Sequence, residues 1–156
     1  VGGADKEKAL SAVQCASTAA VNASDSLQCN ALLLAIAAEH EAVCLALLDR
    51  PDFVRVSARN SVGATALHLA AANDLVHVCS ALLACPRFTL GANTVDDRGR
   101  TPLDFALDFG DGDAHVVLEA AGARRGAGGV QRRRVREPQL EGAEEPAAVL
   151  VMTSLD

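Results

Sequence analysis

Residues 60–72 have the sequence NSVGATALHLAAA, and this stretch decides the fold. Asparagine tolerates left-handed backbone geometry and glycine adopts positive φ angles, so Asn60 and Gly63 predict a tight turn. Thr65 is a favourable N-cap, because its hydroxyl can accept a hydrogen bond from a backbone amide in the first turn of a helix. The apolar residues expected to form the buried face of that helix are Leu67, Leu69 and Ala70.

The same pattern occurs on both sides of this stretch. The segment NALLLAIA begins at Asn30 and TPLDFAL begins at Thr101, so the three helix starts are 35 and 36 residues apart. A polar turn residue precedes each start by five residues, namely Asp25, Asn60 and Asp96. A second helical segment follows each first one, at Glu39–Leu48, Asp74–Leu83 and Asp111–Leu118. A repeat of this length predicts stacked helical units, each of which buries its apolar face on its neighbours.

The three units resemble the ankyrin repeat, whose signature is D-x-x-G-x-T-P-L-H-x-A-A. The matching residues are Asn60, Gly63, Thr65, Leu67, His68, Ala70 and Ala71 in one unit, and Asp96, Gly99, Thr101, Pro102 and Leu103 in another. The resemblance implies an all-α solenoid in which each repeat has two antiparallel helices and a protruding β-hairpin finger. The expected repeats span about 25–59, 60–95 and 96–123, within a domain of residues 21–123. Residues 1–20 are expected to form an N-terminal half-repeat, with its outer helix at Ala9–Ala20.

The chain departs from the family pattern in length and at its C-terminal end. The repeats are longer than the usual 33 residues, and the extra residues fall in 49–56 and 84–92. Each of these segments contains a phenylalanine, Phe53 or Phe88, which we expect to tuck under the stack. Asp104 replaces the usual histidine of the third repeat and Glu119 replaces its last leucine. Because a terminal repeat needs a polar outer face, both replacements predict an exposed cap.

Residues 124–156 differ from the rest of the chain in composition. They begin with the glycine-rich segment 124–129, followed by a basic cluster at 132–136 and an acidic, proline-containing stretch at 137–146. Such a composition predicts a flexible tail. The apolar stretch 147–152 is the exception and is a candidate for docking on the repeats or on a partner. The basic cluster is expected to be solvated, and a nuclear import signal is the alternative.

Composition and charge limit the class of protein. The net charge of −6 disfavours a nucleic-acid partner and favours a basic or amphipathic protein segment. The five cysteines are odd in number and lack CxxC spacing, which predicts reduced thiols and an intracellular, cytoplasmic or nuclear, location. The longest apolar run, 30–38, is too short to span a membrane.

The chemical motifs in the chain are weak. The triplet Asp108-Phe109-Gly110 matches the magnesium-binding triplet of kinases, but the other kinase motifs are missing. No GxSxG elbow is present, and the histidines are spread over the repeats rather than clustered with other metal ligands. His68 is expected to serve loop hydrogen bonding and helix packing. We therefore predict no enzymatic activity, no metal site and no cofactor.

The predicted function is binding of another protein, by a monomeric module that uses its concave face and its finger loops. The family resemblance implies that the contacts to the partner come from finger tips, first helices and helix ends. These residues are Arg59, Ser61, Val62, Leu33, His68, Asn73, Asp74, Asp97, Arg98, Arg100 and Asp104. Because the sequence begins with valine, the alternative is a regulatory or targeting fragment of a larger multidomain enzyme or channel. A further alternative is a spacer without a partner, whose third repeat frays.

Overall fold

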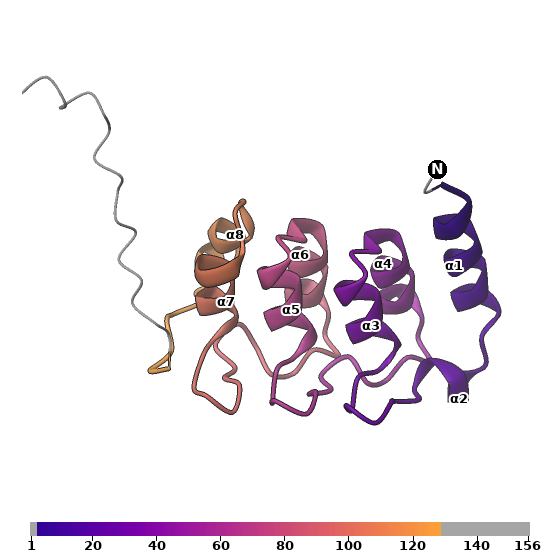
Figure 1. Ribbon diagram of the computed structural model, residues 1–156, viewed down its shortest axis with the longest axis horizontal. Helices are drawn as coiled ribbons and strands as arrows, with labels where there is room; N and C mark the ends of the chain where they lie inside the picture. Colours follow the sequence, from indigo (N-terminus) through magenta and orange to yellow (C-terminus); the bar gives the residue numbers. More distant parts are fainter. Residues whose placement is uncertain (1–2, 129–156) are drawn as a thin grey trace, which may run out of the picture.

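The computed structural model describes residues 3–128, which fold into a row of helix pairs with loops projecting from one edge (Figure 1). This part of the chain has eight helices and, apart from two isolated β-bridges, no β-structure. The helices are α1 (Gly3–Cys15), α2 (Thr18–Val21), α3 (Ala31–Ala37), α4 (Glu41–Asp49), α5 (Ala66–Ala72), α6 (Val76–Ala84), α7 (Pro102–Phe109) and α8 (Ala114–Ala120). The expected all-α solenoid is confirmed.

The helices form two layers. The inner layer contains α3, α5 and α7, in which α5 packs against both of its neighbours. The outer layer contains α4, α6 and α8, and α1 extends it by packing on α4 (Figure 1). Each inner helix also contacts the outer helix that follows it, so every pair buries apolar side chains both within the repeat and between repeats.

The finger turns have the same hydrogen bonds in all three repeats. One side-chain oxygen of the polar turn residue accepts bonds from the amides two and four residues later, which in the second finger are Val62 (3.1 Å) and Ala64 (2.9 Å). Asp25 and Asp96 make the same pair of bonds. Gly63 has φ +76°, and a side chain there would overlap the carboxylate of Asp97. Glycine is therefore needed at Gly63 for both its conformation and its lack of a side chain.

The core lies between the two helix layers and continues beneath them. Leu32, Leu67 and Leu82 are fully buried, as their positions in the repeat predict. Phe53 and Phe88 are also buried, and this confirms that the longer connections tuck a phenylalanine under the stack. Glu119 is exposed, as expected for a polar terminal cap.

The first twenty residues contain a helix in the outer layer, but its bounds differ from those expected. The predicted helix at Ala9–Ala20 is instead α1, which starts earlier, and the short α2. Arg50 donates hydrogen bonds to the backbone oxygens of Val13 and Ala16. Arg87 likewise donates hydrogen bonds to the backbone oxygens of Arg50 and Phe53. Ala16 and Arg50 correspond, because each directly follows the outer-layer helix of its unit, α1 or α4. The α1 unit thus joins the stack as a repeat joins its predecessor.

The outer helices start two or three residues later than their sequence predicts. In the first two repeats, the turn between the helices is made by Glu39 and Asp74, which both have positive φ angles. The third repeat differs, because Gly110 has φ −85° and α7 is one residue longer than α3 or α5. The predicted tail start at 124 is also not a structural boundary, since Arg124 and Gly126 form hydrogen bonds with residues of the second and third repeats. The predicted docking of 147–152 lies outside the described residues.

Candidate partner-binding surface

The inner helices expose one stripe of side chains on the face opposite the outer layer. It consists of the positions four, seven and eight residues after each N-cap, and we call it the outward stripe. Its members are residues 34, 37 and 38 in the first repeat, residues 69, 72 and 73 in the second, and residues 105, 108 and 109 in the third. Ala38 and Asn73 are the C-caps of α3 and α5, and Phe105 is the one buried member, at 7% exposure. Leu34 is 50% exposed and Phe109 is 58% exposed, although most apolar residues of these helices are buried. Exposed apolar side chains mark an interaction surface where they form a contiguous patch, whereas single ones are common on any protein surface.

Aromatic packing fixes the third-repeat end of the outward stripe. Phe105 and Phe109 lie one helical turn apart and pack edge to face, with ring centroids 5.7 Å apart. The guanidinium carbon of Arg100 lies 4.4 Å from the centre of the Phe105 ring, in a cation–π arrangement. Arg100 also forms an ion pair with Asp96, at 2.7 Å. The exposed ring of Phe109 therefore rests on side chains whose positions are fixed by these contacts.

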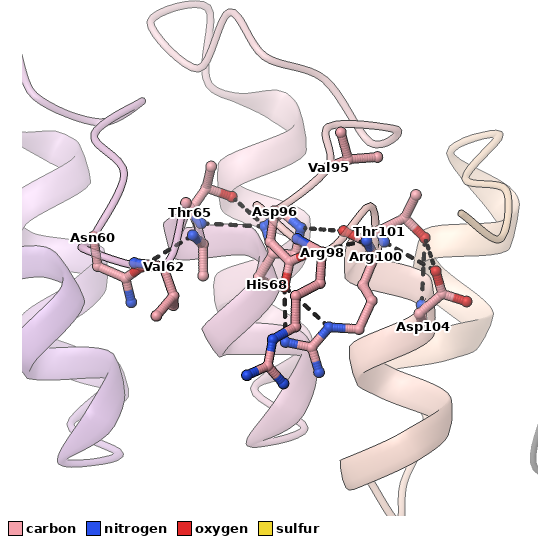
Figure 2. Close-up of polar contacts among 12 residues, drawn as sticks. Asn60, Val62, Thr65, His68, Val95, Asp96, Arg98, Arg100, Thr101 and Asp104 are labelled. Atoms are coloured by element: carbon pink, nitrogen blue, oxygen red, sulfur yellow. Dashed lines mark hydrogen bonds and ion pairs between the residues drawn. The ribbon is translucent and has the colours of Figure 1, made fainter. Parts of the chain in front are cut away.

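Four of the predicted contact residues are exposed on the second and third finger tips. These are Ser61, Val62, Asp97 and Arg98. A backbone bond from the Asp97 amide to the Val62 carbonyl joins the two fingers, at 3.2 Å, and a shallow groove lies between them. The second and third fingers thus form one continuous edge, and Val62 and Arg98 lie on it (Figure 2).

Three predicted contact residues are buried, and the expectation that they are exposed is wrong. Leu33, His68 and Asp104 have at most 1% of their surface exposed. All three lie at the third position after the N-cap, where the side chain faces the neighbouring repeat. The next residue, such as Leu34, faces solvent instead. The sequence therefore predicts the first helices correctly, but the exposed face of α3 lies one residue later than expected.

His68 connects its own helix to the next finger (Figure 2). The Thr65 amide donates to Nδ1 of His68 at 3.2 Å, and Nε2 lies 3.0 Å from the carbonyl oxygen of Arg100. Because a carbonyl only accepts, Nε2 must carry the proton and Nδ1 must be the acceptor. This arrangement uses the neutral imidazole, and burial lowers the pKa of His68 below its ordinary value of 6.5. The expected hydrogen-bonding and packing role of His68 is confirmed.

This burial predicts that acidification destabilises the fold. When the pH falls below 6.5, the unfolded chain takes up a proton at His68 that the folded chain excludes until a lower pH. The free energy of unfolding should therefore fall from pH 7 to pH 5.5, by at most about 1.4 kcal/mol per pH unit from this group. Urea melts at several pH values measure this slope. The His68→Asn variant should have a shallower slope, and equal slopes would contradict the assignment.

Four other predicted contact residues hold the repeats together. The guanidinium of Arg59 donates to the carbonyl oxygen of Val95 (2.6 Å) and to the hydroxyl of Thr94 (3.0 Å). Asn73 donates to the carbonyl oxygen of Ile36, and Asp74 accepts from the amide of Ala114 at the start of α8. Arg100 is half-buried in the contacts described above. Substituting these residues would therefore change the stack as well as the surface.

Asp104 replaces histidine and performs the same capping role. Its Oδ2 accepts from the Thr101 amide at 2.9 Å, as Nδ1 of His68 does in the second repeat. The remaining contact differs in direction, because Oδ2 accepts from the amide of Gly126 whereas His68 donates to a carbonyl. Asp104 was expected to belong to an exposed terminal face of the stack, but its side chain is fully buried.

The helix pairs and the loops differ in their charged residues. The helix-pair segments 31–49, 66–84 and 102–120 contain no lysine or arginine. Their acidic residues are Glu39, Glu41, Asp49, Asp74, Asp104, Asp108, Asp111, Asp113 and Glu119. The connecting segments and finger loops carry the arginines, at 50, 55, 59, 87, 98, 100, 124 and 125, together with Asp25, Asp52, Asp96 and Asp97. The helix pairs thus carry only negative charge, whereas the loops carry both signs.

No chemical centre stands out in residues 3–128. This part of the chain has no group of three or more His, Cys, Asp or Glu side chains placed to hold a metal ion. None of its helices is long and apolar enough to cross a membrane. In the kinase-like triplet, Phe109 ends α7 and Gly110 follows it as the C-cap, as expected for an inter-helix junction.

Comparison with known proteins agrees with this geometry. The family described as "Ankyrin repeats (3 copies)" matches residues 32–123, which cover α3, except for its first residue, through α8. No individual curated protein matches the chain.

Proposed function

Because the chain belongs to the ankyrin-repeat family, we propose that it binds another protein through the outward stripe and the tips of the second and third fingers. Proteins of this family generally act as protein-interaction modules. The exposure of Leu34 and Phe109, in helices whose other large apolar side chains are mostly buried, is the observation that carries this proposal. Burial of such side chains on binding contributes about 25 cal/mol per Å² of apolar surface.

The charges beside the stripe suggest the chemistry of the partner. Val62 and Arg98 are exposed at the finger edge, beside Asp97, whereas the charged side chains of the helix segments are all acidic. The partner we propose is an amphipathic segment whose apolar side chains cover Leu34 and Phe109. Its acidic side chains face Arg98, and its basic side chains face the turns between the helices. Such complementarity contributes mainly to specificity and to the rate of association.

No catalytic step belongs to this proposal. A rigid surface made by packed helices loses little conformational entropy on binding, which favours affinity without chemistry. We also propose an intracellular setting, because the five cysteines of the described structure are free thiols. Cys44 and Cys79 are buried, and burial raises the pKa of each thiol to about 12, so both are unreactive.

The test is a binding experiment with surface variants that leave the core intact. We expect Leu34→Glu and Arg98→Glu to abolish or strongly weaken capture of a partner from cell lysate. The first places a charge in an apolar contact, and the second reverses the charge that faces the acidic side chains of the partner. Val116→Glu is the matched control for Leu34→Glu. Val116 is 51% exposed and lies on α8, outside the stripe. Circular dichroism melts should show all three variants folded.

Three outcomes distinguish the proposed surface from a site on the outer helices and from the fragment and spacer alternatives. A protein retained by Val116→Glu but lost by both other variants would support the proposed surface. A protein lost only by Val116→Glu would move the site to the outer helices. Equal capture by every variant, or capture of none, would refute the proposal and favour the fragment or spacer alternatives. Arg59 and His68 are unsuitable for this test, since both make contacts inside the stack.

A further inference from the structure

One hydrogen-bonded arrangement recurs three times between successive units and extends past the third repeat. In each case a short polar side chain accepts from one backbone amide of the next unit and donates to the carbonyl two residues earlier. The three sets are Asn22 with Asp52 and Val54, Ser57 with Arg87 and Thr89, and Asn93 with Gly122 and Arg124. The bonds are 2.6–3.2 Å long. Residues 122–124 therefore occupy the place where a fourth repeat would begin.

The residues that follow lie on the free edge of the third finger. We call residues 121–128 the strap. The amide of Gly128 donates to the carbonyl oxygen of Gly99 at 3.0 Å, and the hydroxyl of Thr101 donates to that of Arg124 at 2.7 Å. A side chain at Gly126 would overlap the oxygen of Gly99, and one at Gly128 would overlap that of Arg98. These glycines, which suggest only flexibility in the sequence, permit a close backbone contact.

The strap gives the third finger a second neighbour. The second finger has hydrogen bonds on both edges. The Ser61 amide donates to the carbonyl oxygen of Leu27, and the Asp97 amide donates to the carbonyl oxygen of Val62. The third finger has the second finger on one edge and, within the described residues, the strap on the other. Its tip carries Asp97 and Arg98, which belong to the proposed binding surface.

We propose that the strap is a detachable substitute for a fourth finger, which holds the third finger in its partner-binding conformation. Release of the strap would then loosen the third finger and lower its affinity for a partner. This regulatory consequence rests on the proposed function, but the coupling between strap and finger does not. By linkage, a partner on the third finger would also favour the docked strap.

Shallow burial makes the strap detachable. Ala123 is its one buried residue, at 9% exposure, and the others are exposed or half-buried. Segments with few apolar contacts open locally at a lower free energy than the core. The buried carboxylate of Asp104 anchors the strap through Oδ2, while the Arg125 guanidinium lies 3.6 Å from its Oδ1. The strap is thus held mainly by polar contacts, which water can replace when it opens.

Amide hydrogen exchange on the full 156-residue chain tests the coupling without a partner. In the wild type, the amides of Arg124, Gly126 and Gly128 should be protected, but less than those in the middle of α7. The Gly126→Ala variant should lose this protection. The Arg98 and Arg100 amides of the third finger should then exchange about five- to tenfold faster, as expected for the loss of one or two hydrogen bonds. The equivalent Val62 and Ala64 amides of the second finger should not change.

Two further variants separate strap release from general damage. Ala127→Ser changes an exposed strap residue and should exchange like the wild type. Asp104→His copies the second repeat, in which Nδ1 caps the helix and Nε2–H points toward the next finger. It should keep α7 capped but release the strap, because Nε2–H would face the N–H of Gly126. The third finger should then loosen as it does in Gly126→Ala.

Each result decides the proposal. Faster third-finger exchange in both releasing variants, with the second finger unchanged, would support it. Unprotected strap amides in the wild type would mean that no docked strap exists. Strap amides that exchange only with global unfolding would show that it is not detachable. A released strap with an unchanged third finger would refute the coupling. None of these outcomes depends on whether a partner is found.

Discussion

Replacing Leu67 with alanine should lower the free energy of unfolding by about 2–5 kcal/mol. Leu67 is fully buried in α5, the central inner helix, which packs against both α3 and α7. The substitution removes apolar contacts and leaves a cavity that a rigid stack closes only in part. A small domain has about 5–15 kcal/mol of stability, so the loss is a large fraction of the total. Urea denaturation followed by circular dichroism measures it.

Leu34→Ala is the matched control for this prediction. It removes the same atoms from the equivalent inner helix, at a side chain that is 50% exposed. Its effect on stability should therefore be a fraction of the Leu67→Ala effect, while its effect on partner binding should be larger. Similar losses of stability in the two variants would contradict the assignment of Leu67 to the core and of Leu34 to the surface.

Replacing His68 with alanine should be comparably destabilising, for a different reason. The variant leaves the Thr65 amide and the Arg100 carbonyl without their side-chain partner. A buried polar group that loses its partner costs about 1–3 kcal/mol. The edge-to-face contact with Phe105, at 5.0 Å between centroids, is also lost. We expect a total loss of about 2–5 kcal/mol, measured by the same denaturation method.

His68→Asn is the variant to compare with His68→Ala. An asparagine oxygen can take over the bond from the Thr65 amide but does not reach as far as the imidazole. It should therefore recover part of the stability that alanine loses. If the alanine and asparagine variants had equal stability, or both matched the wild type, the hydrogen bonds of His68 would not contribute to the free energy of unfolding.

Local chemistry explains why so much of the fold was predictable. Asn60, Gly63 and Thr65 each determine one feature of the backbone through their own side chain or its absence. Their recurrence at the same spacing gives the number and order of the repeats. The buried phenylalanines of the long connections were predictable in the same way, because a large apolar residue in a polar loop needs a core to enter.

The binding surface was less predictable, because adjacent positions on a helix face different neighbours. His68 and Leu69 differ by one residue, but the first is fully buried and the second is partly exposed. In an all-apolar segment such as ALLLAIA, periodicity gives no way to distinguish the side that faces the next repeat from the side that faces solvent. The tertiary stack makes that distinction.

The strap was not predictable for another reason. Gly126 and Gly128 dock through backbone atoms, so their side chains leave no signature in the sequence. Asp104 was recognised as a departure, but the direction of its hydrogen bond depends on which backbone group the following segment presents. That group is known only once the chain has turned back over the third finger.

The arginine hydrogen bonds between units have a consequence for how such a chain gains or loses units. Arg50 donates to the carbonyl oxygen of Ala16, which directly follows α1, and Arg87 donates to that of Arg50, which directly follows α4, although the two arginines occupy different positions in the aligned repeats. The junctions before and after the first repeat therefore share this contact. A recombination event that removed one whole period would join surfaces that already fit, and a duplication would add one without any new type of contact. The length of the stack can thus change in a single genetic step.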